Sequence, residues 1–406
     1  MICTDVGGTT FDVGLIFNGE LQLDAEPVLD QYAYALPKVL VKSIGAGGGS
    51  IGWIDAGGAL RVGPRSAGST PGPACYGKGG TEPTVTDADV VLGYLDPDNP
   101  LAGSLKLDAA AARTAIHSVA ARLGVDDITL AAAMFSIANA QMADLIRKST
   151  VEKGFDPRDF ILLCYGGAGP VHAAFYAADT GVKATYIPAE SSVFSAYGML
   201  TTDMLFQAEM TLQLRTPLTA AQRARIEEVY QNLEAKVRES FARNQLDVAS
   251  VTLTRSVDMR FAMQVHEIPV PGPRALMDEA GVAALLASFR EKYEFTYGRN
   301  TAFGGAQVEL MTFRVMGQAP VRRFTAPAAP LTARGAPPPH ACKPAWFEGI
   351  GFVPTNRYRG DQLQPGHALS GPAIVDRMGD TIVIPPGVAG AVDGHGNVVL
   401  TSGGQR

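Results

Sequence analysis

The feature that most constrains this chain is a glycine turn between two short apolar strands at its start. Alternating apolar residues predict strands over residues 2–6 and 11–17. The turn between them consists of Gly7, Gly8, Thr9 and Thr10. Because glycine lacks a Cβ, backbone N–H groups in such a turn can approach an anion closely. The residues allow two interpretations, a cradle for a phosphate tail or an ordinary glycine hairpin.

Two carboxylates, Asp5 and Asp12, flank this turn. In the first interpretation they are candidate catalytic residues and magnesium ligands, because carboxylates hold a hydrated metal while amides and hydroxyls hold phosphate oxygens. In the second, they cap the turn by accepting hydrogen bonds from its amides.

Composition and charge narrow the class of protein. The chain has 406 residues, 46% of them hydrophobic and 18% charged, which is enough for two or three domains with buried cores. Its formal net charge of -6 gives no reason to expect nucleic acid or an anionic membrane as partner. The most apolar run, residues 131–143, is interrupted by polar side chains and is too short to span a bilayer. We therefore expect a cytoplasmic protein.

Two further glycine segments follow along the chain. Residues 45–52 are unusually rich in glycine, and the candidate ligand-contacting positions are Gly47, Gly48 and Gly49. Close approach to a phosphate or tight packing would each explain them. An apolar strand over residues 159–165 then ends in a loop that opens a helix, the arrangement that presents amides and a positive dipole end to an anion or a sugar edge. The candidate nucleoside-side residues in this loop are Gly166, Gly167, Ala168, Gly169 and Pro170.

Two further residues have alternative roles. His172 lies in the first helical turn after that loop. It is either a proton carrier or metal ligand, or a neutral histidine with a structural role. Cys75 lies in a long Gly- and Pro-rich loop and is either a nucleophile or a packing residue. The four cysteines have no paired spacing, which argues against a disulfide framework and a zinc knuckle.

Helix and strand patterns divide the chain into four segments. Residues 1–200 alternate strands and helices, with helices predicted over 109–123 and 130–153. Residues 201–320 predict an α+β domain with two helices on an antiparallel sheet. Residues 321–345 have the proline- and alanine-rich composition of a linker, and residues 346–406 predict a small β-rich module.

Together, the glycine segments and several long motifs resemble the hydantoinase A/5-oxoprolinase family, as in N-methylhydantoinase A and the related ATPase subunits of acetone and acetophenone carboxylases. The motifs contain unusual residue combinations, and the resemblance extends over effectively the whole chain. They lie at residues 43–51, 61–77, 80–89, 151–159, 165–173 and 371–387.

The resemblance implies an α/β fold in which residues 1–200 form one ribonuclease-H-like lobe of an actin-like ATPase. It implies ATP and Mg²⁺ as cofactors, with ATP-dependent cleavage of a cyclic amide such as a hydantoin or 5-oxoproline. The lactam carbonyl would be activated by phosphorylation. An ATPase subunit of a ketone carboxylase is the alternative. The implied partners are a hydantoinase B-like subunit and a small cyclic-amide or ketone substrate.

One departure from the family concerns the start of the chain. Members carry an additional N-terminal lobe with its own Asp-x-Gly-Gly-Thr turn, whereas only four residues precede Asp5 here. We therefore expect the Asp5 turn to be the second phosphate loop, and the chain alone to be a poor ATPase. Either a separate N-terminal-lobe polypeptide supplies the missing half or the sequence is a fragment. A non-catalytic scaffold is a further alternative.

Overall fold

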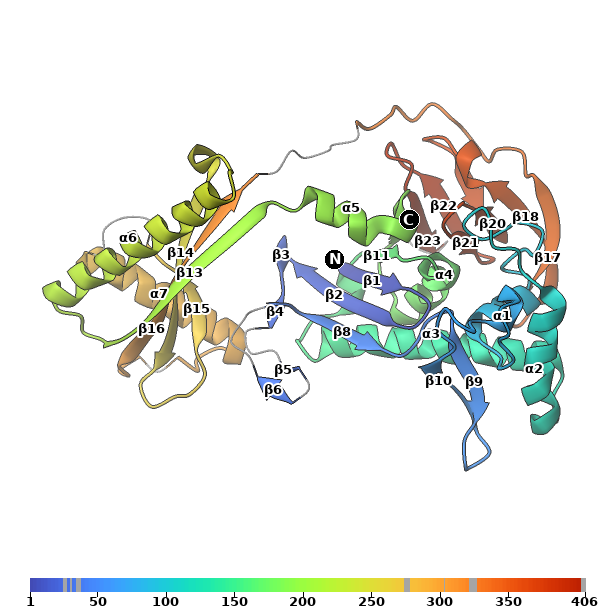
Figure 1. Ribbon diagram of the computed structural model, residues 1–406, viewed down its shortest axis with the longest axis horizontal. Coiled ribbons are helices and arrows are strands. Elements are labelled where there is room, and N and C mark those ends of the chain that lie inside the picture. The colour runs from blue at the N-terminus through green and yellow to red at the C-terminus, as the bar shows by residue number, and fades with distance from the viewer. Residues whose placement is uncertain are drawn as a thin grey trace. The chain divides into compact units, whose positions relative to one another are not determined.

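The computed structural model is mixed α/β, and it describes residues 1–24, 28–29, 31–33, 38–273, 278–302, 304–320 and 327–402. The chain divides into two compact units. The first combines Met1–Tyr197 with Ala326–Arg406, and the second is Gly198–Thr325. The second unit is thus an insertion, in sequence, into the first (Figure 1).

The first unit is built on a central mixed sheet (Figure 1). Strand β1 pairs antiparallel with β2, which pairs in turn with β8 and β3, while β11 and β12 continue the sheet in parallel from the other side of β1. The bounds are β1 (Ile2–Val6), β2 (Phe11–Phe17), β3 (Glu20–Leu21), β8 (Val41–Ile44), β11 (Leu162–Tyr165) and β12 (Thr185–Ile187). Four short strands form two separate pairs, β4 (Leu23–Asp24) with β7 (Lys38–Val39) and β5 (Val28–Leu29) with β6 (Tyr32–Ala33).

Alternation along β1 and β2 separates a core face from a polar face, because successive strand side chains point to opposite sides. Phe11, Val13 and Leu15 are buried together with residues of the two helices that cover this face. Asp5 and Asp12 alternate with these apolar residues and are only partly buried. The sheet therefore presents its carboxylates away from the hydrophobic core.

Helix α2 has the bounds that the sequence predicts, whereas α3 begins three residues before the predicted start at 130 and ends two residues before 153. Asp108 caps α2 (Ala109–Leu123), which ends at Gly124 in the left-handed conformation. Asp126 caps α3, and α1 begins with a capping box between Thr84 and Asp87. The remaining bounds are α1 (Val85–Val91), α3 (Asp127–Val151), α4 (Gly169–Thr180), α5 (Phe194–Thr201) and the hairpin β9 (Ser50–Ile54) with β10 (Leu60–Ser66).

Helix α3 has 25 residues. It is therefore longer than the apolar run of residues 131–143, which by itself is too short to span a bilayer. By length and composition alone it is the one helix among the described residues that could cross a membrane. Met134, Met142 and Ile146 are completely buried in the hydrophobic clusters of the first unit. A core helix passes the same test of length and composition, and the packing of α3 is that of a core helix.

The C-terminal strands join the first unit, which differs from the separate module expected for residues 346–406. Strand β23 pairs with β12 and extends the central sheet through β22 and β19. The physical reason is that β12 would otherwise leave an unpaired edge. The bounds are β19 (Ala368–Ser370), β22 (Val388–Val392) and β23 (Val398–Ser402), with a second sheet of β17 (Ala341–Phe347), β18 (Gly351–Arg359), β20 (Ala373–Asp376) and β21 (Thr381–Ile384).

A buried ion pair ties this second sheet to α1. Arg357 on β18 is 1% exposed and donates two hydrogen bonds to Asp376 on β20. Its other N–H groups donate to the carbonyl oxygens of Gly93 and Tyr94, just after α1. Of the predicted linker, residues 321–326 lie outside the described residues, and β17 already begins at Ala341.

The second unit is the predicted α+β arrangement of two helices and an antiparallel sheet, in the order β13-β16-β14-β15. Its long first strand was not anticipated, and it pairs along the length of β16. The bounds are β13 (Met204–Arg215), α6 (Ala220–Arg243), β14 (Thr252–Phe261), β15 (Ile268–Pro271), α7 (Glu279–Tyr297) and β16 (Val308–Ala319).

Candidate functional site

The structure brings the three glycine segments together at the ends of β1, β8 and β11. The amides of Gly48 and Gly49 donate to the carbonyl oxygens of Gly7 and Gly8, at N···O distances of 3.1 and 2.6 Å. On the other side, the Ala168 amide donates to the carbonyl oxygen of Val6 at 3.0 Å. Segments far apart in the sequence therefore form one continuous backbone surface.

The turn after β1 is the open part of this surface. Gly8, Thr9 and Thr10 are exposed, and the turn is closed by a hydrogen bond from the Gly7 amide to the Thr10 carbonyl. A Cβ built on Gly7 or Gly8 would meet no atom within 4 Å, and neither has a positive φ. The protein's own packing and backbone conformation therefore do not require glycine at these two positions.

Gly47, Gly48 and Gly49 have a different environment, because they are buried beneath that turn. A Cβ on Gly47 would lie 2.7 Å from the carbonyl oxygen of Gly7. The Gly47 amide donates to the Ser50 hydroxyl, and those of Gly48 and Gly49 are bonded to the turn. Of the two interpretations of this segment, the geometry favours tight packing: it supports the turn from below.

The loop after β11 has one strained position and one exposed position. Gly166 has a φ of +86°, and a Cβ there would collide with Asp5 and Val6. Gly167 is exposed, and α4 begins at Gly169 with Pro170 in its first turn. The loop thus contacts Asp5 on one side and exposes Gly167 just before the N-terminus of α4.

Asp5 and Asp12 occupy directly opposite positions on β1 and β2. Asp5 accepts a hydrogen bond from the Ser195 hydroxyl at 3.0 Å, and Asp12 accepts from the hydroxyls of Ser43 and Thr10. These donors are side-chain hydroxyls rather than the turn amides that the capping alternative required. The sequence did not reveal Ser43 or Ser195, because β-sheet pairing and a distant helix bring them to the site.

Burial raises the pKa of Asp5 above its ordinary value, the Ser195 hydrogen bond opposes this, and the negative charge of Asp12 raises it further. Two carboxylates placed opposite each other in a sheet repel when both are ionised. A cation bound between them would relieve this repulsion and favour the ionised form of both.

The donor set at these carboxylates fits magnesium better than a cation that needs an all-protein cage. The described residues hold no group of three or more His, Cys, Asp or Glu side chains that could surround a metal. Magnesium is commonly held by one or two carboxylates, with water and substrate phosphates completing its octahedron. Asp5 and Asp12 are the residues that would hold it here.

His172 lies in the core rather than at the open turn. It is completely buried and stacks on Phe135 with ring centroids 4.8 Å apart. Its Nε2 lies 3.8 Å from an oxygen of the buried Asp89. Burial lowers the pKa of His172 to about 3, and burial together with Asp87 raises the pKa of Asp89 well above its usual range. A neutral, structural histidine is therefore the interpretation that the structure favours.

The lowered pKa of His172 predicts acid sensitivity of the fold. Between pH 6.5 and about 3 the unfolded chain binds a proton at this imidazole and the folded chain does not, so stability falls as the pH falls. At pH 4.5 the loss is on the order of 2 kcal/mol. We expect His172→Phe, which preserves stacking on Phe135, to weaken this dependence. Urea unfolding at pH 7 and pH 4.5 measures it, and equal losses in variant and wild type would contradict the assignment.

Cys75 is also a core residue. Its side chain is completely buried, and burial together with the charge of Asp87 raises the pKa of its thiol. The Cys75 amide donates to Asp87 at 2.8 Å. A thiol that is buried and difficult to ionise is a poor nucleophile, so the packing role is favoured.

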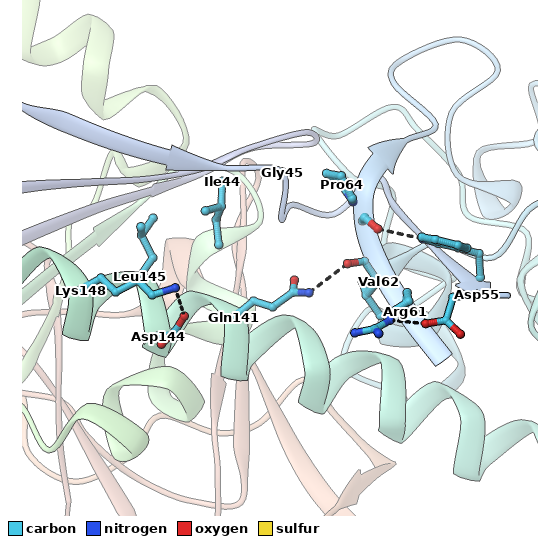
Figure 2. Close-up of a pocket in the computed structure, with 12 residues that line it drawn as sticks. Ile44, Gly45, Asp55, Arg61, Val62, Pro64, Gln141, Asp144, Leu145 and Lys148 are labelled. Carbon is cyan, nitrogen blue, oxygen red and sulfur yellow. Dashed lines mark hydrogen bonds and ion pairs between the residues drawn. The ribbon is translucent and has the colours of Figure 1, made fainter. Parts of the chain in front are cut away.

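A cavity of about 610 Å³ lies on the opposite face of the sheet (Figure 2). Ile44 and residues of β10 and α3 line it, and it includes the ion pairs Asp55–Arg61 and Asp144–Lys148. Neighbouring residues on β8 point to opposite faces. Ile44 faces the cavity, whereas Ser43 bonds to Asp12. The cavity is therefore distinct from the carboxylate site.

Comparisons with known proteins identify the family of this chain. Residues 1–208 match the hydantoinase/oxoprolinase family model, and residues 216–401 match the hydantoinase/oxoprolinase C-terminal domain. The chain is 34% identical over 414 residues to caprolactamase subunit alpha of Pseudomonas jessenii, and 32% identical over 409 residues to the acetone carboxylase beta subunit of Xanthobacter autotrophicus. A nucleotide-free structure of acetone carboxylase, an enzyme of ATP-dependent acetone carboxylation, superimposes with a TM-score of 0.85 at 29% identity.

The coverage of these matches is unequal. They include 99%, 97% and 99% of this chain, respectively, but only 58%, 56% and 58% of the relatives. The chain thus spans a little over half the length of the proteins it matches, and within that span the two family models leave few residues unmatched. The chain belongs to the hydantoinase/oxoprolinase family.

Proposed function

We propose that this chain is a component of an ATP-dependent cyclic-amide hydrolase acting on lactams or imides of the hydantoin or 5-oxoproline type. In this proposal the first unit contains one ribonuclease-H-like lobe of an actin-like ATPase. The sheet supports it, because three antiparallel strands continue into two parallel strands, with the glycine turn at the end of the central strand.

The observation that carries the proposal is the open turn at Gly7 and Gly8. Neither internal packing nor backbone conformation explains glycine there, whereas close approach of a phosphate does. The two carboxylates beside the turn add the ligands that the magnesium ion of a nucleotide requires.

ATP would supply a phosphoryl group that activates the unreactive carbonyl oxygen of the substrate. The residues of this chain would bind and orient it. Amides of the exposed residues Gly8, Thr9 and Thr10 would hold phosphate oxygens, and Asp5 and Asp12 would hold hydrated magnesium. The loop from Gly166 to Pro170 would contact the nucleoside. Positioning and charge stabilisation of this kind account for most catalysis in phosphoryl transfer.

The remaining half of the nucleotide site would come from a second lobe. We propose that a hydantoinase B-like subunit completes the enzyme. The names of the relatives support this, because both are given as subunits of larger enzymes.

Calorimetric titration with Mg-ATP and an ATP turnover assay test the proposal. The chain is assayed alone and co-expressed with the proposed partners, with hydantoins, 5-oxoproline and larger lactams as substrates. We expect weak binding by the chain alone and substrate-stimulated turnover by the assembly. An assembly that shows neither Mg-ATP binding nor stimulated turnover would overturn the proposal.

A ketone carboxylase subunit is the second candidate, supported by the TM-score of 0.85 with acetone carboxylase. The same assay separates the two, with acetone or acetophenone and bicarbonate in place of the lactam. Turnover stimulated only by ketone and bicarbonate would favour the second candidate. A scaffold would bind its partners, yet the assembly would show no nucleotide chemistry dependent on Asp5 and Asp12.

Gly8→Ala provides a direct test of the open turn. The added methyl group meets no protein atom within 4 Å, so we expect the unfolding midpoint to change little. Mg-ATP affinity should fall by about tenfold or more, because the methyl group occupies the space through which a phosphate approaches. Calorimetry and thermal unfolding measure the two effects.

Gly58→Ala is not a suitable control for this change, because Gly58 has a positive φ that disfavours alanine. Gly305→Ala is better matched: Gly305 is exposed outside helices and strands, has no positive φ and has no atom within 4 Å of the added Cβ. Unchanged Mg-ATP affinity in Gly8→Ala would contradict the phosphate role of the turn.

A further inference from the structure

A turn in the C-terminal part of the chain reaches the proposed nucleoside loop. Residues 377–380 connect β20 to β21, and β21 packs against α4 (Figure 1). A Cβ built on Gly167 would lie 3.6 Å from the carbonyl oxygen of Gly379. The turn thus borders the exposed position of the loop, although about 210 residues separate the two in sequence.

Side-chain hydrogen bonds hold the turn of residues 377–380 in place. The Arg377 guanidinium donates two hydrogen bonds to the Asp380 carboxylate, at 2.7 and 2.6 Å. The side chains of Arg377 and Asp380 are 11% and 2% exposed. A bidentate arginine–carboxylate pair fixes both groups in one plane. Gly379 lies so close to Ser192 that a Cβ there would collide with its side chain.

Arg377 and Asp380 also form hydrogen bonds with the segment that follows β12. Arg377 also donates to the carbonyl oxygen of Pro188 at 2.9 Å and to the Ser191 hydroxyl at 3.1 Å. The Ser191 hydroxyl in turn donates to Asp380. Ser191 is completely buried, so its position is set by these contacts.

Ser191 then acts on the glycine loop through its backbone. The carbonyl oxygen of Ser191 accepts a hydrogen bond from the Gly166 amide at 2.9 Å. Gly166 has a φ of +86° and lies beside Asp5. The same short helical segment (Ser191–Val193) leads directly into α5, where Ser195 donates to Asp5. One anchored segment therefore sets both the loop and the hydrogen bond to the carboxylate.

We propose that Arg377 and Asp380 are positioning residues for nucleotide binding, holding Ser191 so that the Gly166–Pro170 loop and the Ser195–Asp5 hydrogen bond have their binding geometry. This inference rests on the proposed function. It assigns to the C-terminal segment a part in the site that the glycine motifs do not indicate. Neither side chain needs to touch the nucleotide.

The chain contains a matched control. Arg357 and Asp376 form a second buried bidentate pair in the same C-terminal segment. The hydrogen bonds of the Arg357 side chain go to Asp376 and to the carbonyl oxygens of Gly93 and Tyr94, just after α1, and not to the glycine loops. Arg377→Lys and Arg357→Lys therefore make the same chemical change, one beside the loop and one at α1.

The experiment uses the full chain in its reconstituted assembly. We expect Arg377→Lys and the milder Ser191→Ala to raise the Kd and KM for Mg-ATP by about tenfold, since small misplacements of a binding loop have large effects. Arg357→Lys should lower the thermal midpoint without changing the Kd. Calorimetry, turnover kinetics and thermal unfolding measure the three quantities.

Two results would overturn the inference. The first is an unchanged Mg-ATP Kd in both Arg377→Lys and Ser191→Ala. The second is an increase in Kd in both Arg377→Lys and Arg357→Lys that is proportional to the loss of stability of each variant. In either case wild-type binding of Mg-ATP would leave the proposed function intact. Failure of the wild-type assembly to bind Mg-ATP would instead overturn the proposed function and this inference with it.

Discussion

Replacing Asp5 or Asp12 with asparagine is expected to lower ATP turnover of the reconstituted enzyme by about two to three orders of magnitude. Asparagine keeps the shape of the side chain and removes the charge that would hold magnesium. Initial rates at saturating Mg-ATP measure the effect. Because the two side chains lie on the polar face of the sheet, with their hydrogen bonds to hydroxyls, the core does not depend on their charge.

Asp5→Asn should lower turnover without lowering the stability of the folded chain. Because the pKa of Asp5 is raised, ionisation of the folded chain above that pKa costs more free energy than ionisation of the unfolded chain. Stability supplied by the protonated form is therefore lost as the pH rises from the ordinary value towards the raised one. At pH 7 we expect the unfolding midpoint of Asp5→Asn to equal or exceed that of the wild type.

Asp144→Asn serves as the control, since Asp144 is a carboxylate at the cavity on the other face of the sheet. Its turnover should remain within a factor of about two, because the change removes only an exposed ion pair with Lys148. If Asp5→Asn and Asp12→Asn retained wild-type turnover, the two carboxylates would have no role in the chemistry.

The second large effect is expected at Arg357. Arg357→Leu removes the bidentate partner of the buried Asp376 carboxylate, which keeps the His340 imidazole at 3.0 Å, and leaves the carbonyl oxygens of Gly93 and Tyr94 without their donor. Breaking a buried pair in this way typically costs about 3–5 kcal/mol. That is a large fraction of the stability of an ordinary domain. Urea unfolding of the full chain, followed by circular dichroism, measures the shift.

The double variant Arg357→Leu with Asp376→Leu distinguishes the cause. Removing both charges avoids the uncompensated carboxylate, so we expect it to recover part of the lost stability. The exposed pair Arg225–Glu228 gives the scale for comparison, and Arg225→Leu should cost less than about 1 kcal/mol. A loss of that small size in Arg357→Leu would show that the buried pair is not needed.

Local signals predicted the elements of the first unit well. Asp108, Gly124 and the apolar periodicity between them specify α2 without help from the rest of the chain. The same holds for the Gly7–Thr10 turn between β1 and β2. Strand β13 was missed although its signal is present: apolar and polar residues alternate strictly from Phe206 to Leu214.

Long-range features of the site could not be obtained in this way. Ser43 and Arg377 lie within the motifs at residues 43–51 and 371–387, but no local pattern assigns a role to their side chains or to that of Ser195. Sheet register and tertiary packing bring these side chains to the carboxylates and glycine loops. The glycines of residues 47–49 are the opposite case, because their sequence signal is clear but has two possible causes. A ligand cradle and a tight backbone contact impose the same demand for a missing Cβ, and only the surrounding atoms distinguish the two.

The pairing of β12 with β23 also has a consequence for the order of folding. The ribosome delivers β12 more than 200 residues before β23, with the whole inserted second unit between them. During that interval β12 presents an unpaired edge to the cell, and closing the loop to β23 is slow because it joins distant parts of the chain. The inserted unit can complete its own sheet first, since β13 to β16 are contiguous. The nascent chain is therefore most vulnerable to aggregation in the interval after β12 has emerged and before β23 has done so.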